Sequence, residues 1–77
     1  MREWLLKLRR DQGLTLKVAA SKLGVSESYY SLIEKGIRQQ RLDMALAEKI
    51  SKLFDVSLDY IAEQDRAVHE KASQSST

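Results

Sequence analysis

Apolar residues recur at intervals of three and four along most of the chain, the spacing that places side chains on one face of an α-helix. The first such stripe comprises Met1, Leu5 and Leu8, with Trp4 beside it. Gly13 then interrupts the pattern and supplies a stop signal. The pattern therefore predicts a first helix that ends shortly before Gly13.

A second helical segment, "LKVAASKL", follows Thr15, whose side-chain oxygen can cap the first turn by accepting from a backbone N–H. Gly24 ends this segment, since glycine readily adopts the left-handed conformation. We therefore expect a tight turn at "LGVS", in which Val25 points inward and Ser26 caps the next helix.

A third helix is predicted over residues 27–35, where Gly36 breaks it. The segment 37–42 has no clean period and is predicted to be a loop. Asp43 can cap a fourth helix. Its apolar residues recur at helical spacing: Met44, Ala47, Ile50, Leu53 and Phe54.

A fifth helix is predicted after Ser57, which can act as its N-cap. This helix carries Leu58 and Ile61 and can continue through Val68, although its polarity rises steadily. The final segment 72–77 is predicted to be a disordered tail.

The composition fits one small all-α domain that is held together by packing alone. The 77 residues include no Cys, no Pro and only three Gly, and 43% of them are hydrophobic. We expect a domain at residues 1–64 and a polar C-terminal extension at 65–77 that is partly helical and then disordered. No apolar run approaches the roughly 20 residues of a membrane span, and the N-terminal apolar stretch is too short for a signal peptide, so we expect a cytoplasmic protein with no membrane partner.

Charge is distributed unevenly along the chain. Residues 1–41 hold nine basic and four acidic side chains, a net charge of +5, whereas residues 42–77 hold four basic and seven acidic ones, a net charge of −3. A basic front half suits a polyanionic ligand, and the alternative is that these are ordinary solvated faces.

Two helices joined by a short turn that contains Gly form the helix-turn-helix arrangement, whose second helix lies in the major groove of DNA. The stretches "LRRDQGLT", "ASKLGVSESYYSLIEKG" and "KLFDVSLDYI" together resemble the phage-repressor-like helix-turn-helix family, also called the Cro/C1 or xenobiotic-response-element type. The resemblance implies an all-α, five-helix, lambda-repressor-like DNA-binding domain, with the motif in the second and third helices, that works as a dimer on paired half-sites. We therefore expect a sequence-specific transcriptional regulator, a repressor, that places residues 27–35 in the major groove of double-stranded DNA.

The resemblance also assigns the two faces of this third helix. Tyr30 and Ile33 are directed inward, and helical geometry agrees because they are three residues apart. Ser31 lies near the opposite, DNA-facing side. The residues directed toward DNA are Glu27, Ser28, Tyr29 and Leu32.

Three further features follow from comparison with the family pattern. Arg9 and Glu34 stand where relatives form a partly buried ion pair, and the alternative is that Arg9 faces solvent. Tyr30 stands where a smaller aliphatic residue is usual and Ala19 where a larger one is usual, so we hypothesise a volume exchange between them. Leu16 replaces a Gln that in relatives often anchors the first helix to a phosphate.

Phosphates and bases are expected to be contacted by different residues. The phosphate candidates lie at the start of the second helix and after the third: Thr15, Lys17, Lys35, Arg38 and Arg41. Ser26, the cap of the third helix, is also predicted to bind DNA. Among base contacts, Ser28 can donate or accept, Glu27 can accept from a cytosine amino group, and Leu32 can contact a thymine methyl. Two alternatives stay open: Tyr29 bonds a phosphate or packs over the turn, and Glu27 reads a base or only favours the helix dipole.

The sequence favours no enzymatic function. His69 is the single His and there is no Cys, so we expect no metal site, no cofactor and no catalytic residue. The competing interpretation is a helix-turn-helix protein-interaction module, such as an antitoxin or the partner of an anti-repressor. The apolar residues Leu6, Leu16 and Leu32 support that alternative, and a protein partner is also compatible with a regulator.

Dimerisation is expected to use the fifth helix and its extension. Ile61, Val68 and Trp4 can form a shared apolar patch between two chains. Alternatively, the extended fifth helix folds back and covers Trp4 within one chain.

Overall fold

The computed structural model describes residues 1–37 and 42–75, with side chains through Val68, and is all-α over these ranges. Five helices are present there: α1 (Glu3–Asp11), α2 (Leu16–Leu23), α3 (Glu27–Lys35), α4 (Met44–Phe54) and α5 (Leu58–Ser75). The predicted five-helix plan is therefore confirmed. Arg38 and Arg41, with most of the predicted loop, lie outside the described residues.

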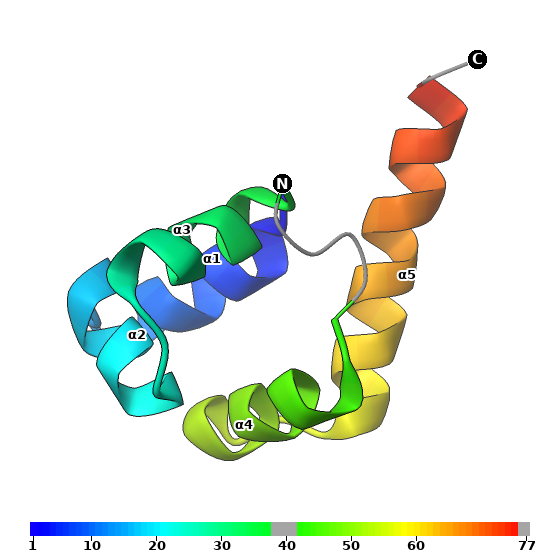
Figure 1. The fold of residues 1–77 in the computed structure, drawn as a ribbon. Coiled ribbons are helices and arrows are strands. Elements are labelled where there is room, and N and C mark those ends of the chain that lie inside the picture. Colours follow the sequence, from blue (N-terminus) through cyan, green and yellow to red (C-terminus); the bar gives the residue numbers. More distant parts are fainter. Residues whose placement is uncertain (38–41, 76–77) are drawn as a thin grey trace.

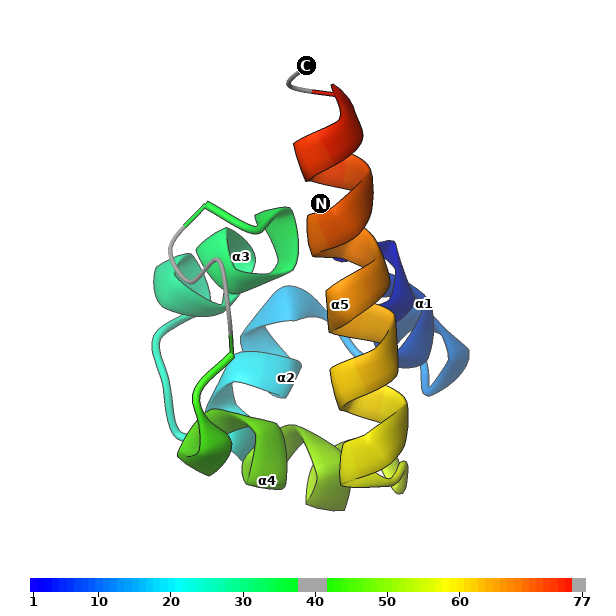
Figure 2. The same ribbon diagram turned by 90° about the vertical axis from the view of Figure 1, so that its right-hand side faces the viewer.

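The helices form a group of three and a pair. In Figure 1, α1, α2 and α3 pack together, α4 runs along one end of that group, and α5 stands beside it. Contacts join α2 with α3 and with α4, α4 with α5, and α1 with α3. Figure 2 agrees with Figure 1 that the C-terminal part of α5 extends beyond the other helices.

The predicted helix caps explain why the elements begin and end where they do. Each N-cap side chain accepts a hydrogen bond of 2.8 to 3.2 Å from the backbone N–H three residues further on: Thr15, Ser26, Asp43 and Ser57. Gly24 and Gly36 end α2 and α3 in the left-handed conformation, with φ of 76° and 75°. The bounds of α3 therefore equal the predicted range 27–35.

The core confirms most of the predicted apolar faces but corrects two methionines. Met1 precedes α1 and is 58% exposed, and Met44 is 66% exposed at the first position of α4. The buried residues of α4 are Leu46, Ile50 and Phe54, and Ala47 and Leu53 pack against the core beside them. The predicted face of α4 is therefore correct apart from Met44, and Leu46 was missed.

The N-terminal end of α1 is covered by α5. Trp4 is buried and meets Tyr60 edge to face, with ring centroids 6.5 Å apart. Ile61 is also buried within the chain. The predicted patch of Ile61 and Trp4 between two chains is therefore wrong, and the alternative in which α5 covers Trp4 is the one observed.

The C-terminal extension is helical further than predicted. The structure continues α5 to Ser75, four residues into the segment 72–77 that was expected to be disordered. Neither Gly nor Pro occurs after Gly36, so nothing in the sequence of α5 forces the helix to stop.

Candidate nucleic-acid interface

The two faces of α3 have opposite environments. Tyr30 and Ile33 are fully buried, as predicted. On the other face Glu27 and Ser28 are exposed, and Leu32 is half-buried without belonging to the group that packs against the core. The inward residues therefore fix the helix while its opposite face stays open.

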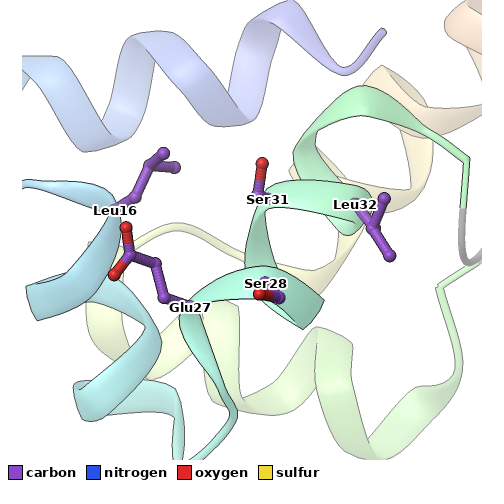
Figure 3. Close-up of a pocket in the computed structure, with 5 residues that line it drawn as sticks. All are labelled: Leu16, Glu27, Ser28, Ser31 and Leu32. Carbon is purple, nitrogen blue, oxygen red and sulfur yellow. The ribbon is translucent and has the colours of Figure 1, made fainter.

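An open groove of about 530 Å³ runs along this outward face. It is lined by Leu16 from the start of α2 and by four residues of α3: Glu27, Ser28, Ser31 and Leu32. Figure 3 shows Leu16 and the Glu27 carboxylate side by side at one end, Leu32 at the other, and the two serines between them. Four of the predicted DNA-facing residues thus come together, and the structure adds Leu16 from another helix.

The capping hydroxyls of Thr15 and Ser26 each accept a backbone hydrogen bond and still have a hydrogen to donate. Thr15 Oγ1 accepts from the Val18 N–H over 3.2 Å, and Ser26 Oγ accepts from the Tyr29 N–H over 3.1 Å. A hydroxyl has one donor hydrogen besides its acceptor lone pairs, so both caps can still donate to an anion. The caps therefore hold the starts of α2 and α3 and also supply donors there.

The remaining predicted contact residues have varied positions. Lys17 on α2 and Lys35 at the end of α3 are exposed. Tyr29 is half-buried and packs against the core cluster, a position that leaves both of its alternatives as predictions. Ser31 is half-buried at the groove.

The predicted ion pair between Arg9 and Glu34 joins α1 to the end of α3. Arg9 Nε donates to Glu34 Oε2 over 2.8 Å, and Nη2 donates to Oε1 over 3.2 Å. Arg9 Nη1 also donates to the Leu14 carbonyl oxygen over 2.9 Å. The hydrogen bonds to Glu34 raise the pKa of Arg9, although burial acts in the opposite direction. This pair ties α1 to the C-terminal end of α3.

Tyr30 brings a hydroxyl into the core beside this pair. Burial, followed by the nearby Glu34 carboxylate, raises the pKa of Tyr30. Within the described part of the chain Tyr30 Oη makes no hydrogen bond of normal length and angle. The neutral phenol is therefore strongly favoured in the folded state.

A second arginine network was missed by the sequence analysis. Arg2 is 1% exposed, and its Nε donates to Asp65 Oδ1 on α5 over 2.7 Å. Its Nη1 donates to the Ile33 carbonyl oxygen over 2.6 Å, and its backbone N–H donates to the Glu34 carbonyl oxygen over 2.8 Å. The one available signal was the position of Asp65, four residues after Ile61 and thus on the buried face of α5.

Neither a membrane-spanning helix nor a metal-binding cluster occurs in the described part of the chain. Over that part of the chain no helix has both the length and the apolar character to cross a membrane. Residues 1–37 and 42–75 also contain no cluster of three or more His, Cys, Asp or Glu side chains that could hold a metal ion.

An exposed, capped α3 that follows α2 across a glycine turn defines a helix-turn-helix protein. A family model described as helix-turn-helix matches residues 5–61, which is most of the chain. The chain therefore belongs to the helix-turn-helix family, in its phage-repressor-like form, and is a DNA-binding regulator. Searches among curated proteins and among solved structures returned no match.

Proposed function

We propose that the protein is a sequence-specific transcriptional repressor that binds double-stranded DNA as a homodimer and places α3 in the major groove. The observation that carries this proposal is the open face of α3, which is lined by side chains and backed by fully buried Tyr30 and Ile33. An α-helix with its side chains has about the width of the major groove, so such a face can reach base edges.

Phosphate contacts would come from the borders of this face. Thr15 and Lys17 lie at the start of α2, where free backbone N–H groups and the helix dipole favour anions. Ser26 and Lys35 lie at the two ends of α3 and add a donor and a positive charge. Arg38 and Arg41 belong to the proposed set on the sequence alone.

The dimer is proposed to use the part of α5 that extends beyond the other helices. Ile61 and Trp4 are buried within the chain, and half-buried Val68 packs partly against the same core, so the remaining exposed surface of Val68 is the predicted apolar contact. A twofold dimer would place its two copies of α3 on half-sites about 34 to 36 Å apart. Sedimentation equilibrium measures the mass directly, and a monomer at all concentrations would contradict this part of the proposal.

Salt dependence tests the DNA-binding mode. Dissociation constants for a duplex recovered from a random pool, measured at several salt concentrations, should rise steeply because phosphate contacts release counterions. Lys17→Ala should lower the slope of log K against log salt by about one. The control Lys52→Ala removes an exposed lysine at the end of α4 and should leave the slope unchanged.

The same titration separates the competing function. A protein-interaction module centred on Leu16 and Leu32 would bind its partner with little dependence on salt. Failure of the chain to bind any duplex from the pool at low salt would refute the repressor proposal and favour that module.

A further inference from the structure

Among the residues that the structure describes, the Glu27 carboxylate is the one charged group lining the groove, and the helix does not need it as a cap. Ser26 already accepts the capping hydrogen bond from the Tyr29 N–H. Glu27 is exposed and makes no hydrogen bond or ion pair with any residue that the structure describes. The other described lining residues are two leucines and two serines, so within residues 1–37 and 42–68 no basic side chain lines the groove beside the carboxylate.

A free carboxylate at this position selects among base edges because it can only accept hydrogen bonds. Guanine offers two acceptors in the major groove, and thymine offers an acceptor and a methyl group. Adenine offers an amino donor, but its N7 acceptor lies directly beside it and repels the carboxylate. Cytosine offers an amino donor with no adjacent acceptor on its exposed edge. Glu27 therefore fits cytosine best and disfavours guanine most.

Leu16 adds an apolar surface beside this acceptor. Figure 3 shows its side chain next to the Glu27 carboxylate, and the other side of Leu16 packs against the core cluster, so its position is held. On a pyrimidine the C5 position is the neighbour of C4, which carries the cytosine amino group. A methyl group at C5 would therefore meet Leu16 while the amino group meets Glu27.

We propose that Leu16 and Glu27 together bind a cytosine amino group flanked by a pyrimidine C5 methyl group. This inference rests on the proposed function, because it requires α3 to lie in the major groove. The methyl group has two possible sources in DNA, 5-methylcytosine itself or a thymine next to the cytosine. Both present the same apolar contact beside the same donor.

The amino contact is tested by selecting binding sites from a random DNA pool. Wild-type protein should enrich cytosine at one position of each half-site, and replacing that cytosine should weaken binding by about tenfold. Glu27→Gln should move the preference at that position toward adenine, because an amide can bond the adenine N6 and N7 together. Glu48→Gln removes an exposed carboxylate of α4 outside the groove and should keep the wild-type preference.

The methyl contact is tested by altering the DNA, which leaves the fold of the protein untouched. Two modified versions of the selected duplex are compared with the original: in one, 5-methylcytosine replaces the cytosine, and in the other, deoxyuridine replaces an adjacent thymine. The wild-type protein should bind the duplex that gains or loses the relevant methyl group with an affinity changed by about fourfold, the value expected for one buried methyl group. Leu16→Ala, with its folding checked by thermal denaturation, should abolish this change but keep the cytosine preference.

The outcomes separate the two proposals. A methyl effect with either modified duplex that disappears in Leu16→Ala supports the inference and identifies the source of the methyl group. Salt-dependent binding with no cytosine preference, or with a preference that Glu27→Gln leaves unchanged, overturns the inference while the proposed function stands. Absence of duplex binding by the wild-type protein overturns both.

Discussion

At each end of α1 an arginine pairs with a carboxylate of another helix, but the two ends differ in what they connect. The C-terminal end, with Arg9 and Glu34, joins parts of the helix-turn-helix half to one another. The N-terminal end, with Arg2 and Asp65, joins that half to α5 and also contacts the backbone at the end of α3. The first connection spans 25 residues of sequence and the second spans 63.

Two separate ion pairs therefore hold the two parts of the molecule: Arg9 with Glu34 joins α1 to α3, and Arg2 with Asp65 joins the start of α1 to α5. The side chains of Arg9 and Glu34 are 12% and 5% exposed, whereas those of Arg2 and Asp65 are 1% and 11% exposed. Arg2 is the most deeply buried of the four side chains and also donates to the Ile33 carbonyl oxygen, so its removal disrupts a buried network that joins α3 and α5 to the start of α1. The Arg2 end should therefore dominate the stability of the whole chain, and the Arg9 end should mainly fix the orientation of α3.

The largest effect is expected from Arg2→Met. This change leaves the Asp65 carboxylate buried without its arginine and removes a donor from the Ile33 carbonyl. The free energy of unfolding should fall by about 3 to 5 kcal/mol, measured by urea denaturation.

The double variant Arg2→Met with Asp65→Leu is the matched control. Because it leaves no unpaired charge in the interior, it should be less destabilised than either single variant. If the two single effects simply add, Arg2 and Asp65 do not act as a pair.

Glu34→Gln tests the other end and should have a smaller effect. The amide keeps the shape of the side chain but removes the charge that faces Arg9, which retains its bond to the Leu14 carbonyl. We expect a loss of about 2 kcal/mol, read from thermal denaturation. An effect larger than that of Arg2→Met would reverse the ranking of the two ends.

Tyr30→Phe should stabilise the Arg9 end at neutral pH by about 1 kcal/mol, because it removes a buried hydroxyl with no partner in the described structure. Folding raises the pKa of Tyr30, so the neutral phenol favours the folded state. This contribution to the free energy of unfolding is complete below the unfolded pKa of about 10 and declines as the pH rises above it. Unfolding measured from neutral to alkaline pH should show a steeper decline for wild type than for Tyr30→Phe. Parallel curves for the two proteins would contradict the raised pKa.

The smallest effect is expected from Tyr60→Leu at the Arg2 end. Tyr60 is 37% exposed and contributes an edge-to-face contact with Trp4. Its replacement should lower the free energy of unfolding by about 0.5 kcal/mol, measured by urea denaturation. Tyr29→Leu is not a suitable control for this variant, because Tyr29 packs on the core. A loss as large as that of Glu34→Gln would show that the aromatic contact, rather than Arg2, holds α5 in place.

Local chemistry explains which features were predictable from the sequence. The caps at Thr15 and Ser26 and the break at Gly24 depend on residues within one turn of each other, so their signals lie in adjacent letters. The inward direction of Tyr30 and Ile33 follows from helical period together with the family pattern. The pairing of Arg9 with Glu34 came from the resemblance, not from spacing.

The unpredicted features depend on how distant segments meet. Arg2 and Asp65 are both charged and would ordinarily be assigned to the surface, and only the packing of α5 on α1 buries them together. Likewise, Leu16 lines the groove because α2 and α3 pack side by side, and the sequence of α3 alone does not indicate this contact. The roles of the groove residues in DNA binding stay predictions.

The groove on α3 also has a consequence for engineering. Glu27, Ser28 and Ser31 contribute nothing to the buried cluster, so their identities can vary while Tyr30 and Ile33 keep the helix in place. A library randomised at these three codons should contain mostly folded members, so under the proposed function this small chain is a suitable scaffold for selecting new DNA-binding preferences.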